Sequence, residues 1–154
     1  MNRTRLELLN SALLDLHKVL IDAVRAAYEQ KSGPVRGPFE LLRLLTTDPY
    51  FAWLRPLSRL LADVDELLER AEPFTDVELG SIGAEVRSLV EPCSECPTTF
   101  SERYLEALQG RPEVVLAHGR VAKALADLPR CCPASATLSE MLSTQRAARK
   151  GRRN

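Results

Sequence analysis

The chain has 154 residues, of which 45% are apolar, a length that fits one domain able to bury a core without disulfide or metal staples. Lysine plus arginine and aspartate plus glutamate are equal at 21 each, which argues against a uniformly basic surface that coats nucleic acid. No window approaches the roughly 18 unbroken apolar residues of a membrane span, and the N-terminus lacks the continuous apolar region of a secretory signal. We therefore expect a cytoplasmic protein without membrane contact.

The first predicted helix covers residues 6–28. Apolar residues recur along it at alternating spacings of three and four, which is the pattern of one helix face. The apolar arc covers roughly two thirds of the helix circumference, so we expect neighbouring elements on both flanks. The central stripe consists of Leu6, Leu9, Leu13, Leu16, Leu20, Ala23 and Ala27.

A loop and a short helix are predicted over residues 31–46, where glycines and a proline precede an apolar run. A longer helix is predicted over residues 48–70. Asp48 is a suitable N-cap for it, because its side chain can accept a hydrogen bond from the first turn. Pro56 lies inside this pattern and should bend the helix near Ala52, whose carbonyl loses its hydrogen-bond partner.

Three capping-box spacings mark further helix starts, at Thr75, Thr99 and Thr137. The helix after Thr75 is the weakest of the set, because Gly80 and Gly83 each cost roughly 1 kcal/mol relative to alanine. The helices predicted in this part of the chain span residues 75–90, 99–109 and 112–128, with a short last helix that starts at residue 137.

Several helices joined by short loops, with no convincing strand and no internal repeat, predict the fold class. We expect an all-α, single-domain helical bundle of about four to six helices. Residues 1–144 are assigned to this bundle, and residues 145–154 to a basic, disordered C-terminal tail.

The tail has a charge opposite to that of the rest of the chain. Its last nine positions contain no acid, whereas the remainder carries 16 basic and 21 acidic residues. Such a tail can contact nucleic acid, an acidic protein or the acidic body of its own chain, and a solvated end is the alternative. The candidate nucleic-acid residues are Arg146, Arg149, Lys150, Arg152 and Arg153.

Three segments together resemble a family of uncharacterised bacterial all-helical proteins with a DPxFAWLxPLS-like motif. They read DPYFAWLRPLS, LNSALLDLHKVLIDAVRAAYE and SERYLEALQGRPEVVLAH, and the resemblance covers most of the chain up to about residue 128. It implies a bacterial cytoplasmic protein in which the aromatic helix start and the proline bend recur as a unit. It implies no activity, cofactor or catalytic residue, and it does not extend to the cysteine segments or the basic tail.

Four cysteines form two clusters, each followed by proline: Cys93 and Cys96 in EPCSECP, and Cys131 and Cys132 in CCP. Together they are candidate ligands of a Cys₄ zinc site, although a vicinal pair rarely places both sulfurs on one metal. A shared site requires residues 110–112 to form a hairpin that brings the clusters to one end of the bundle. A thiol-redox role of Cys93 and Cys96 and simple free thiols are the alternatives, so zinc is the one cofactor considered.

The two histidines, His17 and His118, lie on apolar helix faces, where they could ligate haem or metal or simply pack in the core. Neither belongs to the Glu-x-x-His spacing of di-iron bundles. The sequence also lacks G-x-S-x-G, a glycine-rich phosphate loop and H-E-x-x-H, so it nominates no catalytic residue and favours a protein that is not an enzyme.

Tyr50, Phe51 and Trp53 place large rings on more than one side of a predicted helix start. Exposed together, they would bind a partner; the alternative is that they cap one end of the core. We therefore predict a protein–protein adaptor or regulator whose partner is another protein or a second copy of itself. A zinc or thiol-redox protein is the first alternative, and weak nucleic-acid binding through the tail is the second.

Overall fold

The computed structural model describes residues 1–91, 95–130 and 137–151. Within these ranges the chain forms seven α-helices and one short 3-10 helix and has no strand, which confirms the predicted all-α class. The elements in chain order are α1 (Asn2–Ser32), α2 (Pro38–Thr47), η1 (Ala52–Leu54), α3 (Arg55–Leu68), α4 (Asp76–Val90), α5 (Thr99–Gly110), α6 (Pro112–Ala126) and α7 (Leu138–Gly151).

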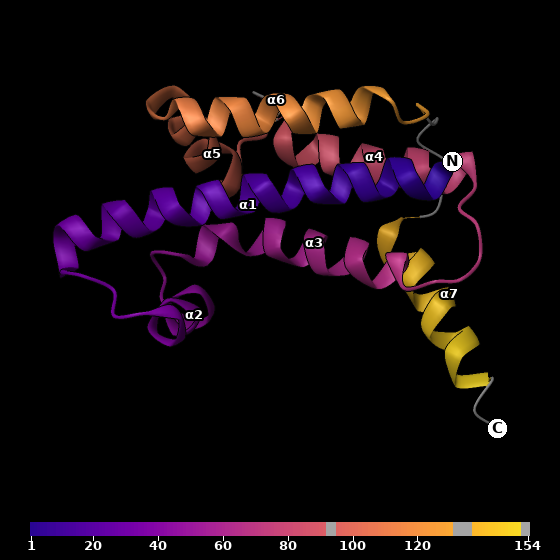
Figure 1. The fold of residues 1–154 in the computed structure, drawn as a ribbon, viewed down its shortest axis with the longest axis horizontal. Coiled ribbons are helices and arrows are strands. Elements are labelled where there is room, and N and C mark those ends of the chain that lie inside the picture. Colours follow the sequence, from indigo (N-terminus) through magenta and orange to yellow (C-terminus); the bar gives the residue numbers. More distant parts are fainter. Residues whose placement is uncertain (92–94, 131–136, 152–154) are drawn as a thin grey trace.

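Helix α1 runs through the middle of the bundle, with α6 along one side and α3 along the other (Figure 1). It has 31 residues and is therefore about 45 Å long. Despite this length, neither α1 nor any other helix in the described ranges is apolar enough to cross a membrane. The five leucines of its predicted stripe have no solvent exposure, namely Leu6, Leu9, Leu13, Leu16 and Leu20.

Helix α4 forms in full, over 15 residues, even though it contains two glycines. The predicted capping box is present, with the Thr75 and Glu78 side chains each bonded to the other's backbone N–H. Gly83 has a packing role, because a β-carbon there would lie only 3.3 Å from the Leu128 Cδ1 atom beyond the end of α6. The glycine that weakens the isolated helix therefore lets two parts of the bundle approach closely.

The long helix predicted from residue 48 is divided. Asp48 ends α2, and its Oδ1 accepts a hydrogen bond of 2.8 Å from the Tyr50 backbone N–H. The chain then passes through the 3-10 turn η1, and α3 begins only at Arg55. Pro56 therefore lies in the first turn of α3, where its missing N–H costs no helical hydrogen bond, and the predicted mid-helix bend is replaced by a turn.

The caps of the last helices agree with the prediction in one case and differ in the other. At α7, Glu140 accepts a hydrogen bond of 2.7 Å from the Thr137 backbone N–H, as its spacing predicts. At α5, the cap is Thr98 paired with Ser101, one residue before the predicted Thr99. Thr98 has the extended backbone that an N-cap requires, whereas Thr99 is already the first helical residue.

The seven described α-helices exceed the expected four to six, because each predicted segment, the short α2 and the glycine-containing α4 included, forms a separate helix. Residues 145–151, assigned from the sequence to a disordered tail, form the last turns of α7. Helix α7 is held against α3 at this point. Gln145 is buried and donates a hydrogen bond of 2.8 Å to the Glu66 carbonyl, and Arg146 and Arg149 bind glutamates of the same region.

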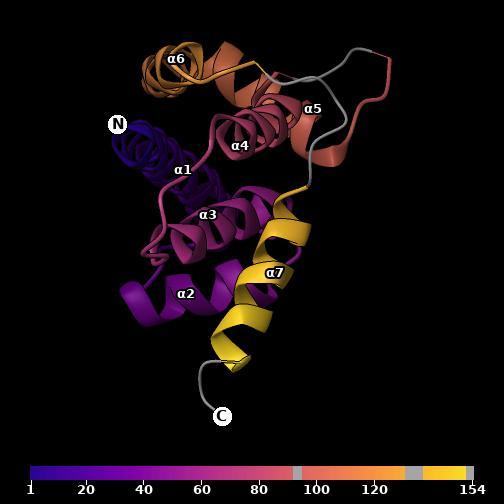
Figure 2. The same cartoon turned by 90° about the vertical axis from the view of Figure 1, so that its right-hand side faces the viewer.

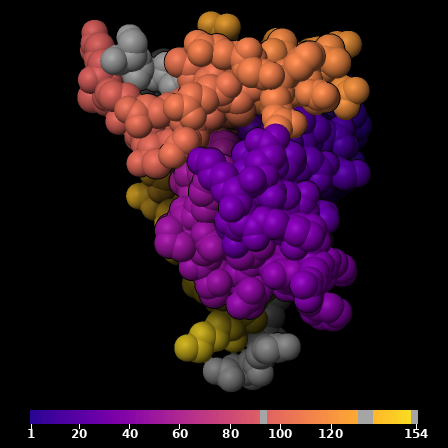
Figure 3. All heavy atoms as spheres, turned by 90° about the vertical axis from the view of Figure 1, so that its left-hand side faces the viewer, coloured from indigo at the N-terminus to yellow at the C-terminus, as the bar shows by residue number. Residues whose placement is uncertain are grey.

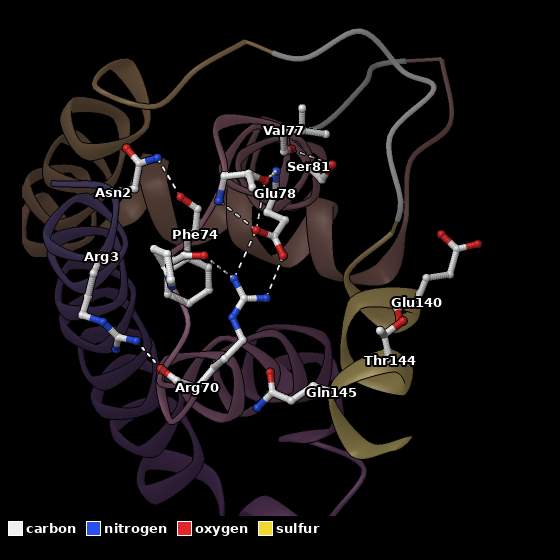
Figure 4. A network of polar contacts seen from close by, with 12 residues as sticks. Asn2, Arg3, Arg70, Phe74, Val77, Glu78, Ser81, Glu140, Thr144 and Gln145 are labelled. Carbon is white, nitrogen blue, oxygen red and sulfur yellow. Dashed lines mark hydrogen bonds and ion pairs between the residues drawn. The ribbon is translucent and has the colours of Figure 1, made fainter. Parts of the chain in front are cut away.

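Figure 4 shows how the segment between α3 and α4 is fixed. The Arg70 guanidinium donates two hydrogen bonds to the Glu78 carboxylate, at 2.7 and 3.1 Å, and lies 4.4 Å from the centre of the Phe74 ring. From α1, Asn2 donates to the Phe74 carbonyl at 2.9 Å, and Arg3 donates to the Arg70 carbonyl. These contacts join the start of α1, the end of α3 and the start of α4. The hydrogen bonds from Arg70, together with those from Thr75, lower the pKa of Glu78 to about 2.

The central stripe of α1 yields a prediction with a matched control next to it. Leu13 is fully buried, whereas half of Leu14 is exposed. We expect Leu13→Ala to lower the free energy of unfolding by about 2 to 5 kcal/mol, because it leaves a cavity in the core. Leu14→Ala should change it by less than about 1 kcal/mol. Urea unfolding followed by circular dichroism measures both, and equal effects would contradict the position of α1.

The Glu78–Arg70 pair predicts a specific acid dependence. Because the pKa of Glu78 falls from 4.5 to about 2 on folding, the pair stabilises the fold fully above pH 4.5 and loses this contribution as the pH falls through about 2. We expect Glu78→Gln to lower the free energy of unfolding by roughly 1 to 3 kcal/mol at neutral pH, a range that is discounted for the partial exposure of the pair. The variant should also show a smaller fall in the free energy of unfolding between pH 4.5 and about 2.

Urea unfolding at neutral pH and at two pH values between 4.5 and 2 measures this effect. Glu102→Gln, at an exposed position of α5, serves as the control and should leave the acid dependence unchanged. If the free energy of unfolding of the Glu78 variant fell with decreasing pH as steeply as that of the unsubstituted chain, the Arg70 contact would not be the origin of the stabilisation.

Candidate functional site

A tight turn after α2 places the three aromatic residues of the DPYFAW segment. The Phe51 and Ala52 N–H groups donate to the carbonyls of Asp48 and Pro49, each at 3.2 Å, so the chain reverses within a few residues. Phe51 is fully buried, with its ring centre 5.4 Å from that of Tyr28 on α1. Phe51 therefore belongs to the core of this chain and offers no exposed surface to a partner.

Tyr50 and Trp53 are half-buried and lie at the edge of this aromatic cluster. The Tyr50 ring centre is 5.7 Å from that of Tyr28, and the Trp53 ring centre is 5.6 Å from that of Phe100 on α5. Each of the two side chains thus has one side packed on the bundle and another side open. Of the three predicted partner-binding residues, these two remain candidates.

Tyr50 and Trp53 line a groove of about 380 Å³ between α1, the η1 turn and α5, which we call the Trp53 groove. Its α1 wall includes Ala23 and Ala27, and its α5 wall includes Ala107 and Gly110. Because these side chains are small, the two helices leave room between them. Figure 3 shows this end of the molecule, with orange atoms of α5 and α6 above the violet atoms of the first two helices.

The rim of the Trp53 groove carries both signs of charge. Arg103 and Glu106 form an exposed ion pair at 3.3 Å on α5. Arg111, at the start of α6, also lines the groove, and its guanidinium has no ion-pair or hydrogen-bond partner among the described residues. The groove therefore combines an apolar interior with one cation that is free to bind an anion.

The two histidines each bond to a separate neighbour. His118 Nδ1 lies 2.8 Å from the Tyr104 hydroxyl, and burial raises the pKa of that hydroxyl above its ordinary value, so it stays protonated. His17 Nε2 lies 2.8 Å from the Ser58 hydroxyl, and burial lowers the pKa of His17, so it is neutral at neutral pH. These contacts agree with packed core histidines.

The Ser58 hydroxyl lies between two neighbours. It is 3.2 Å from the Leu54 carbonyl, to which it can donate, and 2.8 Å from His17 Nε2. The contact between His17 and Ser58 ties α1 to α3.

Of the candidate zinc ligands, only Cys96 lies within the described residues, where its thiol is exposed and free. Cys93, Cys131 and Cys132 lie outside them. Helices α5 and α6 are joined by a turn at Arg111, across which Tyr104 contacts His118. The two helices cross each other, so α6 does not run back along α5 as a shared site requires (Figure 1 and Figure 2). The described part of the chain also holds no cluster of three or more possible metal ligands.

The basic residues of α7 bind the acidic body of their own chain. Arg146 pairs with Glu66 at 2.7 Å and Arg149 with Glu69 at 2.9 Å, while Lys150 is exposed. The remaining two candidates, Arg152 and Arg153, lie outside the described residues. Two of the five cations proposed for nucleic acid are therefore already engaged, which reduces what this segment can offer to phosphates.

Reasoning from the sequence missed the α5 side of the groove. Arg103, Ala107 and Gly110 follow one another at spacings of four and three, which places them on one helix face. A line of small residues on an exposed helix face is the signal that could have revealed it. The position of this face opposite Tyr50 and Trp53 depends on tertiary packing, which local sequence spacing does not predict.

The described geometry defines an all-helical protein with an apolar groove at one end of the bundle. Comparison with protein-family models, with curated proteins and with solved structures finds no match for this chain. The function must therefore be inferred from the residues of the chain itself.

The exposure of Cys96 gives a test of the zinc hypothesis. We expect its thiol to react with a thiol reagent such as dithionitrobenzoate in the native protein, without chelator or denaturant, because a solvent-exposed sulfur is open to attack. Cys96→Ser should remove one reactive thiol per chain. If the native thiols reacted only after a chelator had removed zinc, a Cys₄ site would be established instead.

Proposed function

We propose that this chain is a non-enzymatic adaptor or regulator of the cytoplasm that binds an amphipathic helix of a partner protein in the Trp53 groove. The bound helix would carry an acidic side chain near one end of its apolar face. One observation carries this proposal: an apolar groove has an arginine, Arg111, at its rim without a partner among the described residues.

The walls of the groove suit a helix. Helices pack with their axes about 8 to 10 Å apart, and the smaller the side chains at the contact, the closer they can approach. Small residues that allow a close approach line both walls of the groove: Ala23 and Ala27 on α1, and Ala107 and Gly110 on α5. Trp53 lies between the two walls and presents a large apolar ring to the apolar face of the incoming helix.

The residue types at the groove support binding of a protein rather than mere packing. Tryptophan, tyrosine and arginine are the residues most enriched among those that dominate binding energy at protein interfaces, and the groove contains Tyr50, Trp53 and Arg111. Arg103 adds a second cation at the rim, where it forms an exposed ion pair with Glu106.

Two other functions stay as alternatives. A zinc or thiol-redox role would use Cys93, Cys96, Cys131 and Cys132, of which Cys96 has an exposed thiol. Nucleic-acid binding through Arg146, Arg149, Lys150, Arg152 and Arg153 is less favoured, because the first two of these residues are paired with glutamates. It predicts binding that weakens strongly with salt.

The chain contains a single tryptophan, so the intrinsic emission of Trp53 reports directly on the groove. The probes are three amphipathic helical peptides that share one apolar face and differ only in carrying glutamate, glutamine or lysine at its edge. We expect the glutamate peptide to shift Trp53 emission in a saturable way and to bind most tightly. The reason is that an acidic side chain gains a charge-assisted contact with Arg111.

Charge reversal at the rim supplies the control. Arg111→Glu should weaken binding of the glutamate peptide by about fivefold, the effect of one partly exposed charge pair, and should favour the lysine peptide. Arg36→Glu, at an exposed position outside the groove, should change neither. Equal effects of the two variants, or no change of Trp53 emission with any peptide, would refute the proposal. A shift that depends on protein concentration alone would identify a second copy as the occupant.

A further inference from the structure

A second cavity lies at the opposite end of α1, away from the Trp53 groove. It has a volume of about 500 Å³ and is enclosed by residues 69–72 after α3, the first turn of α4 and one face of α7. This volume lies within the range of pockets that hold small organic ligands. Figure 4 shows the polar residues around it, with Arg70 and Glu78 on one side and Gln145 reaching in from α7.

Two side chains that line this cavity each keep one buried polar atom without a hydrogen-bond partner among the described residues. They are the Nε of Arg70 and the Oε1 of Gln145. Only 8% of Gln145 is exposed, and its Nε2 is occupied by the Glu66 carbonyl. The two terminal nitrogens of Arg70 are occupied by Glu78 and the Pro73 carbonyl. A buried polar atom left without a partner is costly, so each gains from a ligand that supplies one; because less than 1 Å² of either atom is exposed, the side chains around them must shift slightly to admit it.

The two atoms have opposite requirements. Arg70 Nε–H can only donate a hydrogen bond, and the Gln145 Oε1 can only accept one. An organic cation would satisfy Gln145 and leave the arginine unmatched. A carboxylate would satisfy Arg70, but it has no proton for Gln145. It would also enter a cavity that is lined by four glutamates and only two arginines, Arg70 and Arg149.

We propose that this cavity is a binding site for a small neutral molecule with a primary carboxamide, whose carbonyl accepts from Arg70 Nε and whose N–H donates to Gln145 Oε1. The remainder of the molecule is apolar, because Ala71, Met141 and Ala148 supply an apolar part of the wall. Since α7 and the segment before α4 both contribute to the cavity, the bound molecule joins them.

The chain is well suited to a direct test, because it contains only two methionines, Met1 and Met141. Met141 lines the cavity, whereas Met1 is 91% exposed. Full-length protein labelled with ¹³C at the methionine methyl groups therefore gives two signals, which Met141→Leu assigns. The probes are benzamide, benzylamine, acetophenone and benzoate, which share one ring and differ in donor, acceptor and charge.

We expect benzamide to shift the Met141 signal in a saturable way, to leave Met1 unchanged, and to bind more tightly than the other three probes. Gln145→Leu removes the acceptor and should weaken benzamide binding by about three- to tenfold, the value of one neutral hydrogen bond. Gln109→Leu makes the same change at an exposed position of α5 and should leave binding unaltered. Arg70→Lys keeps the positive charge, removes the Nε donor, and should weaken binding similarly.

Circular dichroism shows whether each variant remains folded, and Arg70→Lys provides the test if Gln145→Leu loosens α7. No saturable shift of Met141 with benzamide would overturn the proposal. Tightest binding of benzylamine would replace it with a site for organic cations. Equal binding of benzamide and acetophenone would show that the Gln145 acceptor is not used.

Discussion

The fold depends on the burial of one unbroken leucine stripe along α1. This stripe lies on a helix long enough to cross the whole bundle, and α6 covers it from one side while α3 covers it from the other. The remaining helices attach to this three-helix centre. Helix α4 fills the space beside α3 and α6, and α7 crosses the outer side of α3, as the turned view of Figure 2 shows. A polar residue in the stripe would weaken the contacts of α1 with both α6 and α3, on which the outer helices pack.

Contacts between aromatic rings fix the side chains of the Trp53 groove to the core of the bundle. Phe51 is fixed in the core against Tyr28, and Trp53 rests on Phe100, whose ring stacks on Tyr104 at 5.4 Å. Side chains held in this way lose little further freedom when a partner binds, which favours affinity. The groove and the cavity below α7 lie at opposite ends of α1, so the same helix supports both.

Local patterns in the sequence were sufficient for the class of fold and for most helix starts. The apolar spacing of α1 and the capping boxes at Thr75 and Thr137 depend on residues close in the sequence, and the structure contains all three. The bend predicted at Pro56 is wrong because the effect of a proline depends on where its helix begins. The contact of Asp48 with Tyr50 forms where α2 ends, and the helix that contains Pro56 starts later. The length of α7 depends on the distant glutamates of α3, which no local pattern contains.

Only part of the candidate site could be predicted from the sequence, because the rest depends on contacts between distant residues. Tyr50 and Trp53 stand out as large aromatic residues, but whether a ring is open or buried depends on what packs over it. Phe51 has the same local signal as its neighbours and is fully buried. The unpartnered atoms of Arg70 and Gln145 lie 75 positions apart in the chain and border one cavity only after folding.

The pairing of α1 with α6 also has a consequence for synthesis of the chain. Asp15 and Arg120, which meet across these helices at 3.4 Å, are 105 residues apart in the sequence. Most helical proteins rely on contacts between near neighbours and fold quickly for that reason. Here α1 is made well before α6 and stays without its main partner until α6 has also been synthesised. Its leucines are therefore exposed during translation, a stage at which chaperones would find them.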